Sequence, residues 1–192
     1  LNVSRSYLQA DNNVKKINTY ITKKVAEKLQ GLFEQDRKAY EDKWKEISVF
    51  VKYGMISDEK FNEKAMGFAL LKNLEGEHFT IEEYKNKIKD NQTDKHNKII
   101  SLYTNDVQGH HSYIKSAKDY GYDILTFDTV IDNHFMQHIE YKGMDMTFVR
   151  VDSDTPDNLV QKDEKKESVL SEKEQEKVKT IFENKKTEAG RL

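Results

Sequence analysis

The sequence predicts an α/β protein with a helical segment, in which an N-terminal helical coil precedes a small three-layer α/β/α domain with a short, mainly parallel sheet. Two patterns lead to this prediction. In the first third of the chain, apolar residues recur at helical spacing, with lysines between them. Further along, short apolar runs alternate with helical stretches of about ten residues, as in βαβ units.

Three helices are expected in the first third. Apolar residues follow the capping residue Asp11 at helical spacing, and we expect this long amphipathic helix to be interrupted near Gly31. A second helix begins at about Asp36 and should end at Gly54, because glycine is common just after a helix C-terminus. Ser57 and Asp58 then cap a third helix.

The α/β region follows this helical part. The third helix should bury Phe68 and Leu71, and a turn comes after it. Thr80 and Glu83 match the capping box that starts a helix. Helices are also expected around Tyr113 and over residues 131–141. Apolar runs suited to buried strands lie at residues 99–103, 124–127 and 146–151.

The alternation of apolar runs and helical stretches ends after Val151. Residues 161–167 are almost wholly charged, with both signs mixed, which is typical of a solvated linker. Ser171 and Glu174 form a second capping box and predict a final helix. Because the chain begins at Leu1 without an initiator methionine, we expect it to be a segment of a longer protein.

The composition excludes several classes of function. The net charge of −2 gives no general attraction to nucleic acid or to an anionic membrane, and we expect neither as a partner. The absence of cysteine excludes disulfides, thiolate zinc sites and cysteine nucleophiles. No run approaches the roughly 20 apolar residues that span a bilayer. The 34% of charged residues and the mean hydropathy of −0.89 suit long exposed helices.

No catalytic motif is apparent. The eight glycines are scattered, and neither GxGxxG nor GxxxxGK[ST] occurs, which argues against a nucleotide site in this segment. His134 and His138 are four residues apart on an expected helix, but no third ligand accompanies them, so we expect no metal. The neighbours His110 and His111 diverge on a helix and are weaker candidates still.

The expected helix over residues 131–141 carries more apolar side chains than one sheet can cover. One interpretation is that Phe135 and Ile139 belong to the core while the rest is surface. The other is a soft patch that contacts proteins, because methionine and aromatic side chains adapt to varied partners.

The opening stretch LNVSRSYLQ closely resembles a motif in the middle domain of the heat shock protein 90 family of ATP-driven chaperones. The resemblance continues over nearly the whole chain, in the stretches NNVKKINTYITKKVAEKL, FVKYGMISDEKFNEKAMGFALLKN, FTIEEYKNKIKDNQTDKHNKIISLYTND and GYDILTFDTVIDNHFMQHI. It implies four parts: a catalytic loop at 1–10, a helical connector at 11–75, a small α/β/α subdomain of the middle domain at 76–153, and a charged linker with the first helix of the C-terminal dimerisation domain at 154–192.

The resemblance implies a role for Arg5. The matching arginine of the family reaches the γ-phosphate of ATP in the N-terminal domain, and Gln9 matches a second polar residue of the same loop. Arginine suits this task because it stays protonated and its planar fork matches phosphate oxygens. If residues 5–9 form a helical turn, Arg5 and Gln9 share a face, with Ser4 as its cap.

The resemblance also implies a client-binding region and a set of partners. The client-binding residues would be Asn133, His134, Phe135, Met136 and Gln137, with His134 standing where some bacterial relatives carry tryptophan. The full-length protein would be a cytoplasmic homodimer that binds ATP with Mg²⁺ mainly through its N-terminal ATPase domain and acts on unfolded clients. This segment alone would not hydrolyse ATP. A non-catalytic helical scaffold or adaptor, and a small α/β enzyme with an unrecognised site, are the alternatives.

Overall fold

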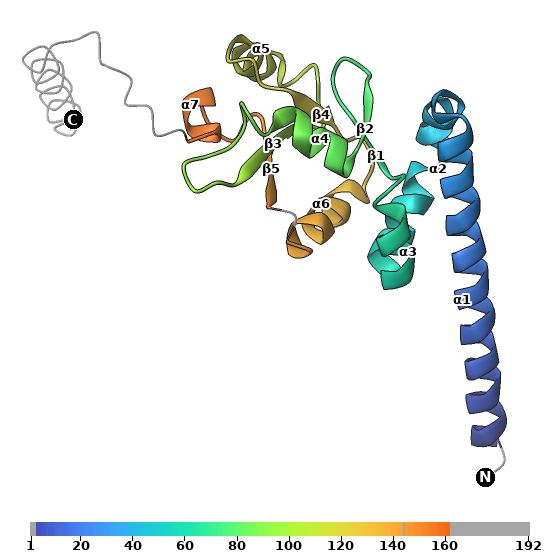
Figure 1. The fold of residues 1–192 in the computed structure, drawn as a ribbon. Helices are drawn as coiled ribbons and strands as arrows, with labels where there is room; N and C mark the ends of the chain where they lie inside the picture. The colour runs from blue at the N-terminus through green and yellow to red at the C-terminus, as the bar shows by residue number, and fades with distance from the viewer. Residues whose placement is uncertain (1–2, 144, 162–192) are drawn as a thin grey trace, which may run out of the picture. The chain divides into compact units, whose positions relative to one another are not determined.

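The computed structural model of the chain (Figure 1) describes residues 3–143 and 145–161, with side chains described from Val14 onward. These residues belong to one compact unit. The charged linker beyond residue 161 and the final helix expected after Ser171 lie outside the described residues, so those predictions stay open.

Three helices form the first part of the chain, as predicted: α1 (Val3–Gln35), α2 (Arg37–Ser57) and α3 (Glu59–Ala65). Two aspartates separate them because each caps the helix that follows. The side chain of Asp36 accepts a hydrogen bond from the backbone N–H of Ala39 at 3.0 Å, and Asp58 accepts one from Phe61 at 2.7 Å.

Helix α1 differs from the prediction at two points. It begins before Asp11, which therefore lies within the helix and does not cap it. It also continues unbroken through Gly31. A single internal glycine costs a helix about 1 kcal/mol, and a long cooperative helix tolerates that cost.

Gly54 does not end α2, contrary to the prediction. The helix continues through it to Ser57. A Cβ atom at Gly54 would lie 2.7 Å from Cε1 of Phe61, whose ring is 5% exposed. The glycine is therefore explained by the close packing of the α3 ring on α2, and not by a helix terminus.

A β-hairpin stands where the third helix was expected to continue. Helix α3 ends at Ala65, and the chain then forms β1 (Leu70–Lys72), which pairs antiparallel with β2 (His78–Thr80). Phe68 and Leu71 are buried, as predicted, but not on a helix. The hairpin crosses the expected boundary between residues 75 and 76.

The parallel sheet agrees with the prediction. Its strand order is β4–β3–β5, and both pairs are parallel. The strands are β3 (Ile99–Thr104), β4 (Ile124–Thr126) and β5 (Met146–Arg150). The helices of this region are α4 (Ile81–Ile88), α5 (His111–Asp119), α6 (Asp132–Tyr141) and α7 (Pro156–Leu159). The capping box of α4 is present, with Glu83 accepting a bond from the Thr80 N–H at 2.8 Å.

Alternate residues of β3 face two separate cores. Ile99 joins the larger core, which also holds buried residues of α2, α3, α4 and α6. Ile100 and Leu102 join a smaller core with residues of α5 and α7. Helices therefore cover both faces of the sheet, which confirms the predicted α/β/α layers.

We predict opposite effects of alanine at two glycines within helices. Gly54→Ala should lower the free energy of unfolding by about 1–3 kcal/mol, because the new methyl group collides with the buried ring of Phe61. The control Gly31→Ala should be neutral or stabilising by about 0.5–1 kcal/mol, since nothing lies within 4 Å of its Cβ position. Urea unfolding followed by circular dichroism measures both. Equal effects at the two sites would contradict the packing role of Gly54.

Candidate functional site

The segment that carries Arg5 and Gln9 is helical. Both residues lie in the first turns of α1, four positions apart, so they share one face of the helix. The stretch expected to be a loop at residues 1–10 is therefore helix from Val3 onward, and Ser4 lies within it. The side chains of Arg5 and Gln9 are outside the described part of the chain, and their predicted role stays a prediction.

Helix α6 divides the five predicted client-binding residues between core and surface. Phe135 is 0% and Met136 is 5% exposed. Asn133, His134 and Gln137 are exposed. The interpretation of Phe135 and Ile139 as core residues is thus correct, and Met136 joins them.

The outer face of α6 is wider than those three residues. Val130 and Tyr141, just before and at the end of the helix, are 92% and 87% exposed. Helical spacing places Tyr141 on the same side as His134 and Gln137. We define the α6 surface as the exposed residues of this helix together with Val130, two positions before it: Val130, Asn133, His134, Gln137 and Tyr141.

A buried ion pair fixes the start of α6. Lys52 of α2 and Asp132 are 6% and 2% exposed, and the Lys52 amino group bonds to Oδ1 of Asp132. The other carboxylate oxygen accepts a hydrogen bond from the Thr129 N–H at 2.9 Å. The Lys52 nitrogen also lies 5.5 Å from the ring centroids of Phe127 and Phe135. Lys52 was not among the predicted site residues, although it falls at helical spacing on the buried face of α2.

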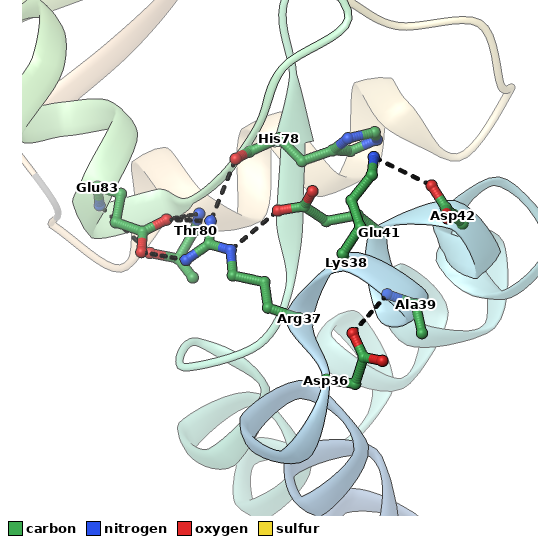
Figure 2. Close-up of polar contacts among 9 residues, drawn as sticks. All are labelled: Asp36, Arg37, Lys38, Ala39, Glu41, Asp42, His78, Thr80 and Glu83. Atoms are coloured by element: carbon green, nitrogen blue, oxygen red, sulfur yellow. Dashed lines mark hydrogen bonds and ion pairs between the residues drawn. The ribbon is translucent and has the colours of Figure 1, made fainter.

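Arg37 joins the beginning of α2 to β2 and α4 (Figure 2). Its guanidinium donates to both carboxylate oxygens of Glu83, with Nη2 to Oε2 at 2.7 Å. The same group donates to the carbonyl oxygen of His78 at 3.1 Å and to Glu41 at 2.9 Å. Hydrogen bonding to Arg37 lowers the pKa of the Glu83 carboxyl. Because Glu83 also caps α4, one arginine positions three elements.

A groove of about 560 Å³ lies beside this contact, between α2, β1 and the loop after β4. We call it the junction groove. Its lining includes the buried aromatic residues Trp44 and Phe127, both at most 5% exposed. His78 also lines it, and burial lowers the pKa of its imidazole. Charged side chains also line the groove, among them Lys45, Lys72 and Asp128.

The histidines do not form a metal site in the described residues. His134 is exposed, whereas Nε2 of His138 lies 3.0 Å from Oδ1 of Asn62. His110 contacts the hydroxyl of Thr104 at 2.8 Å through Nδ1. Within residues 3–143 and 145–161, no group of three or more side chains suited to metal ligation comes together. Nor does any helix in these ranges have the length and apolar character needed to cross a membrane.

Comparison with known proteins identifies the family. The family model described as "Hsp90 protein" matches residues 1–189. The chain belongs to the Hsp90 family. It is 48% identical over 182 residues to the chaperone protein HtpG of Bacteroides thetaiotaomicron, and 45% identical over 183 residues to HtpG of Porphyromonas gingivalis. Each alignment covers 95% of this chain and 27% of the relative, so the chain spans only about a quarter of these curated Hsp90 proteins.

The fold is also similar to a solved structure. The middle domain of a heat shock protein from Plasmodium falciparum matches with a TM-score of 0.56 at 16% sequence identity. The match covers 73% of this chain and 58% of that one. At this identity the likeness concerns the fold, and it agrees with the α/β layers of this Hsp90-family chain.

We predict that removing one charge of the buried ion pair destabilises the fold more than removing both. Lys52→Met should lower the free energy of unfolding by about 3–5 kcal/mol, because it leaves the Asp132 carboxylate buried without its cation. The double variant Lys52→Met/Asp132→Asn should recover much of this loss. As a control, Lys38→Met breaks an exposed pair with Asp42 and should cost about 0–1 kcal/mol. Urea unfolding measures all three, and equal losses for Lys52→Met and Lys38→Met would refute the prediction.

His138 should make stability depend on pH. Burial lowers the pKa of its imidazole, so the folded chain binds this proton less tightly than the unfolded chain. The free energy of unfolding should therefore fall as the pH drops through the ordinary histidine pKa of about 6.5. His138→Gln removes this titration and should flatten the profile between about pH 7.5 and 5.5. Denaturation at matched pH values tests this, and identical slopes for both proteins would contradict it.

Proposed function

We propose that the chain is a segment of an ATP-dependent molecular chaperone that folds and remodels client proteins in the stress response. The match of the Hsp90 family model to residues 1–189 carries this proposal. Two further observations support it. The curated relatives reported above are named chaperone proteins, and the fold resembles the middle domain of a heat shock protein.

Within that protein, Arg5 is proposed to contact the γ-phosphate of ATP, and Gln9 to assist it. Both lie on one face of the first turns of α1, which allows them to act together. Their donor groups fit phosphate oxygens, which accept hydrogen bonds and carry negative charge. ATP with Mg²⁺, held mainly by the N-terminal domain of the full-length protein, supplies the phosphoryl group. Arg5 would stabilise the charge that develops on it, as arginines do in other phosphoryl transfers.

The α6 surface is the proposed contact for unfolded or partly folded clients. It mixes the exposed apolar groups of Val130 and Tyr141 with the polar groups of Asn133, His134 and Gln137. Such a surface suits partners of varied sequence, because aromatic side chains offer apolar contact and amides offer hydrogen bonds. Phe135 and Met136 would support this surface from beneath, through the core.

The full-length protein is proposed to be a cytoplasmic homodimer in which this segment contacts its own N-terminal ATPase and C-terminal dimerisation domains. Arg5 then completes a site whose nucleotide is bound by another domain. The isolated segment would not hydrolyse ATP, whereas a scaffold or adaptor would contribute nothing to turnover in any context.

Replacement of Arg5 tests the catalytic proposal. In the full-length protein, Arg5→Ala should lower kcat for ATP by about a hundredfold or more, with ATP affinity close to that of the wild type, since the interaction is used in the transition state. Arg5→Lys should recover only part of the rate because lysine lacks the planar fork.

The control is Lys16→Ala, which removes an exposed cation from the same helix and should leave turnover unchanged. Steady-state ATPase assays and nucleotide titrations give the two readouts. If Arg5→Ala hydrolysed ATP at the wild-type rate, Arg5 would not be a catalytic residue, and the scaffold interpretation would be favoured.

A further inference from the structure

The junction groove has the size and the chemistry of a binding site. Its volume of about 560 Å³ falls within the range of about 300–1,000 Å³ typical of ligand sites. Its lining includes the aromatic residues Trp44 and Phe127, both at most 5% exposed. The hydroxyl of Thr129, on its wall, is buried and has no hydrogen-bond partner in the described part of the chain.

Most charges around the groove are already paired. Asp42 binds Lys38 at 3.1 Å, and Glu41 binds Arg37 at 2.9 Å. The amino group of Lys52 is taken by Asp132. These pairs leave little charge available to a ligand.

Two lysines and one aspartate are the exceptions. Lys45 of α2 and Lys72 of β1 line the groove, and the side chain of neither makes a hydrogen bond or an ion pair among the described residues. Asp128 is exposed and is the remaining charge of the lining without a partner among the described residues. The available cations therefore outnumber the available anions, and they come from two different walls. A ligand that bridges these walls should carry carboxylates.

The position of the groove favours a polypeptide over a small anion. Thr129, on the groove wall, is followed directly by Val130, the first residue of the α6 surface. Consecutive Cα atoms lie about 3.8 Å apart, so an extended chain of a few residues is long enough to reach from the α6 surface to the groove. This continuity rests on the proposed client role of the α6 surface, whereas the charge argument does not.

We propose that the junction groove binds an acidic, extended polypeptide segment, with its carboxylates on Lys45 and Lys72 and its backbone close to the groove wall that holds Trp44. The groove then adds a charge-selective contact to the apolar one of the α6 surface. Salt should weaken this contact, since both lysines are exposed and screening acts on exposed charges.

Trp44 allows a direct test because it is the only tryptophan of the chain and lies in the groove. The probe is a synthetic peptide with two glutamates on either side of a leucine pair. Its addition to the full chain should change the tryptophan fluorescence in a saturable manner. A peptide with lysine in place of each glutamate should produce no such change.

Matched variants separate the groove from other sites. Lys45→Ala/Lys72→Ala should raise the Kd of the acidic peptide by about tenfold or more. Lys43→Ala/Lys98→Ala removes the same charge from exposed positions outside the groove and should leave the Kd within about twofold of the wild type.

Three results would overturn the proposal. One is equal weakening by both double variants, which would mean a general charge effect. Another is competition by inorganic phosphate at concentrations near the peptide Kd, which would indicate a small-anion site. The third is loss of acidic-peptide binding in His134→Ala with unchanged binding in Lys45→Ala/Lys72→Ala. This result would support the client role of the α6 surface and would show that the groove does not bind the peptide. ATP turnover of the full-length protein is a separate readout and does not enter these outcomes.

Discussion

The ion pair between Lys52 and Asp132 is the constraint on which the junction of helices and sheet depends. Both charges are buried, and a buried charge without its partner is strongly unfavourable. The pair therefore holds the start of α6 against α2. Because Asp132 also accepts a bond from Thr129, the same contact fixes the loop that forms one wall of the junction groove. The same ion pair thus holds both the α6 surface and the groove wall in position.

Further polar contacts tie α6 and α4 to the helical segment. His138 meets Asn62 of α3, and Lys142 at the end of α6 pairs with Glu59. Arg37 makes the corresponding contact for β2 and α4 (Figure 2). The contacts lie along the boundary between the helical segment and the α/β layers, which explains why residues on both sides belong to one compact unit. A partner bound at this boundary would contact both.

The candidate sites were predictable to different degrees. The sequence resemblance directed attention to Arg5 and to the α6 helix, and helical spacing shows which α6 residues share a face. It does not show which face is buried, so Phe135 and Met136 were grouped with exposed neighbours. The junction groove could not be predicted, because α2, β1 and the loop at residues 126–129 meet only in the folded chain. Arg37 was missed for a similar reason, since Glu83 is 46 residues away.

Local chemistry by itself determined the helix caps at Asp36, Asp58 and Thr80 and the three parallel strands. A cap requires only neighbouring backbone groups, and a buried strand reveals itself by its own apolar run. Tertiary packing alone decided the role of Gly54 and the β1–β2 hairpin. A glycine in a helical sequence is consistent either with the end of the helix or with another side chain packed closely on the backbone. At Gly54, only the position of the Phe61 ring in the folded chain shows that close packing is the reason. Strands of three residues are too short to show an alternating pattern of apolar residues. Strands β1 and β2 are stabilised by pairing with each other and by burial against the rest of the chain.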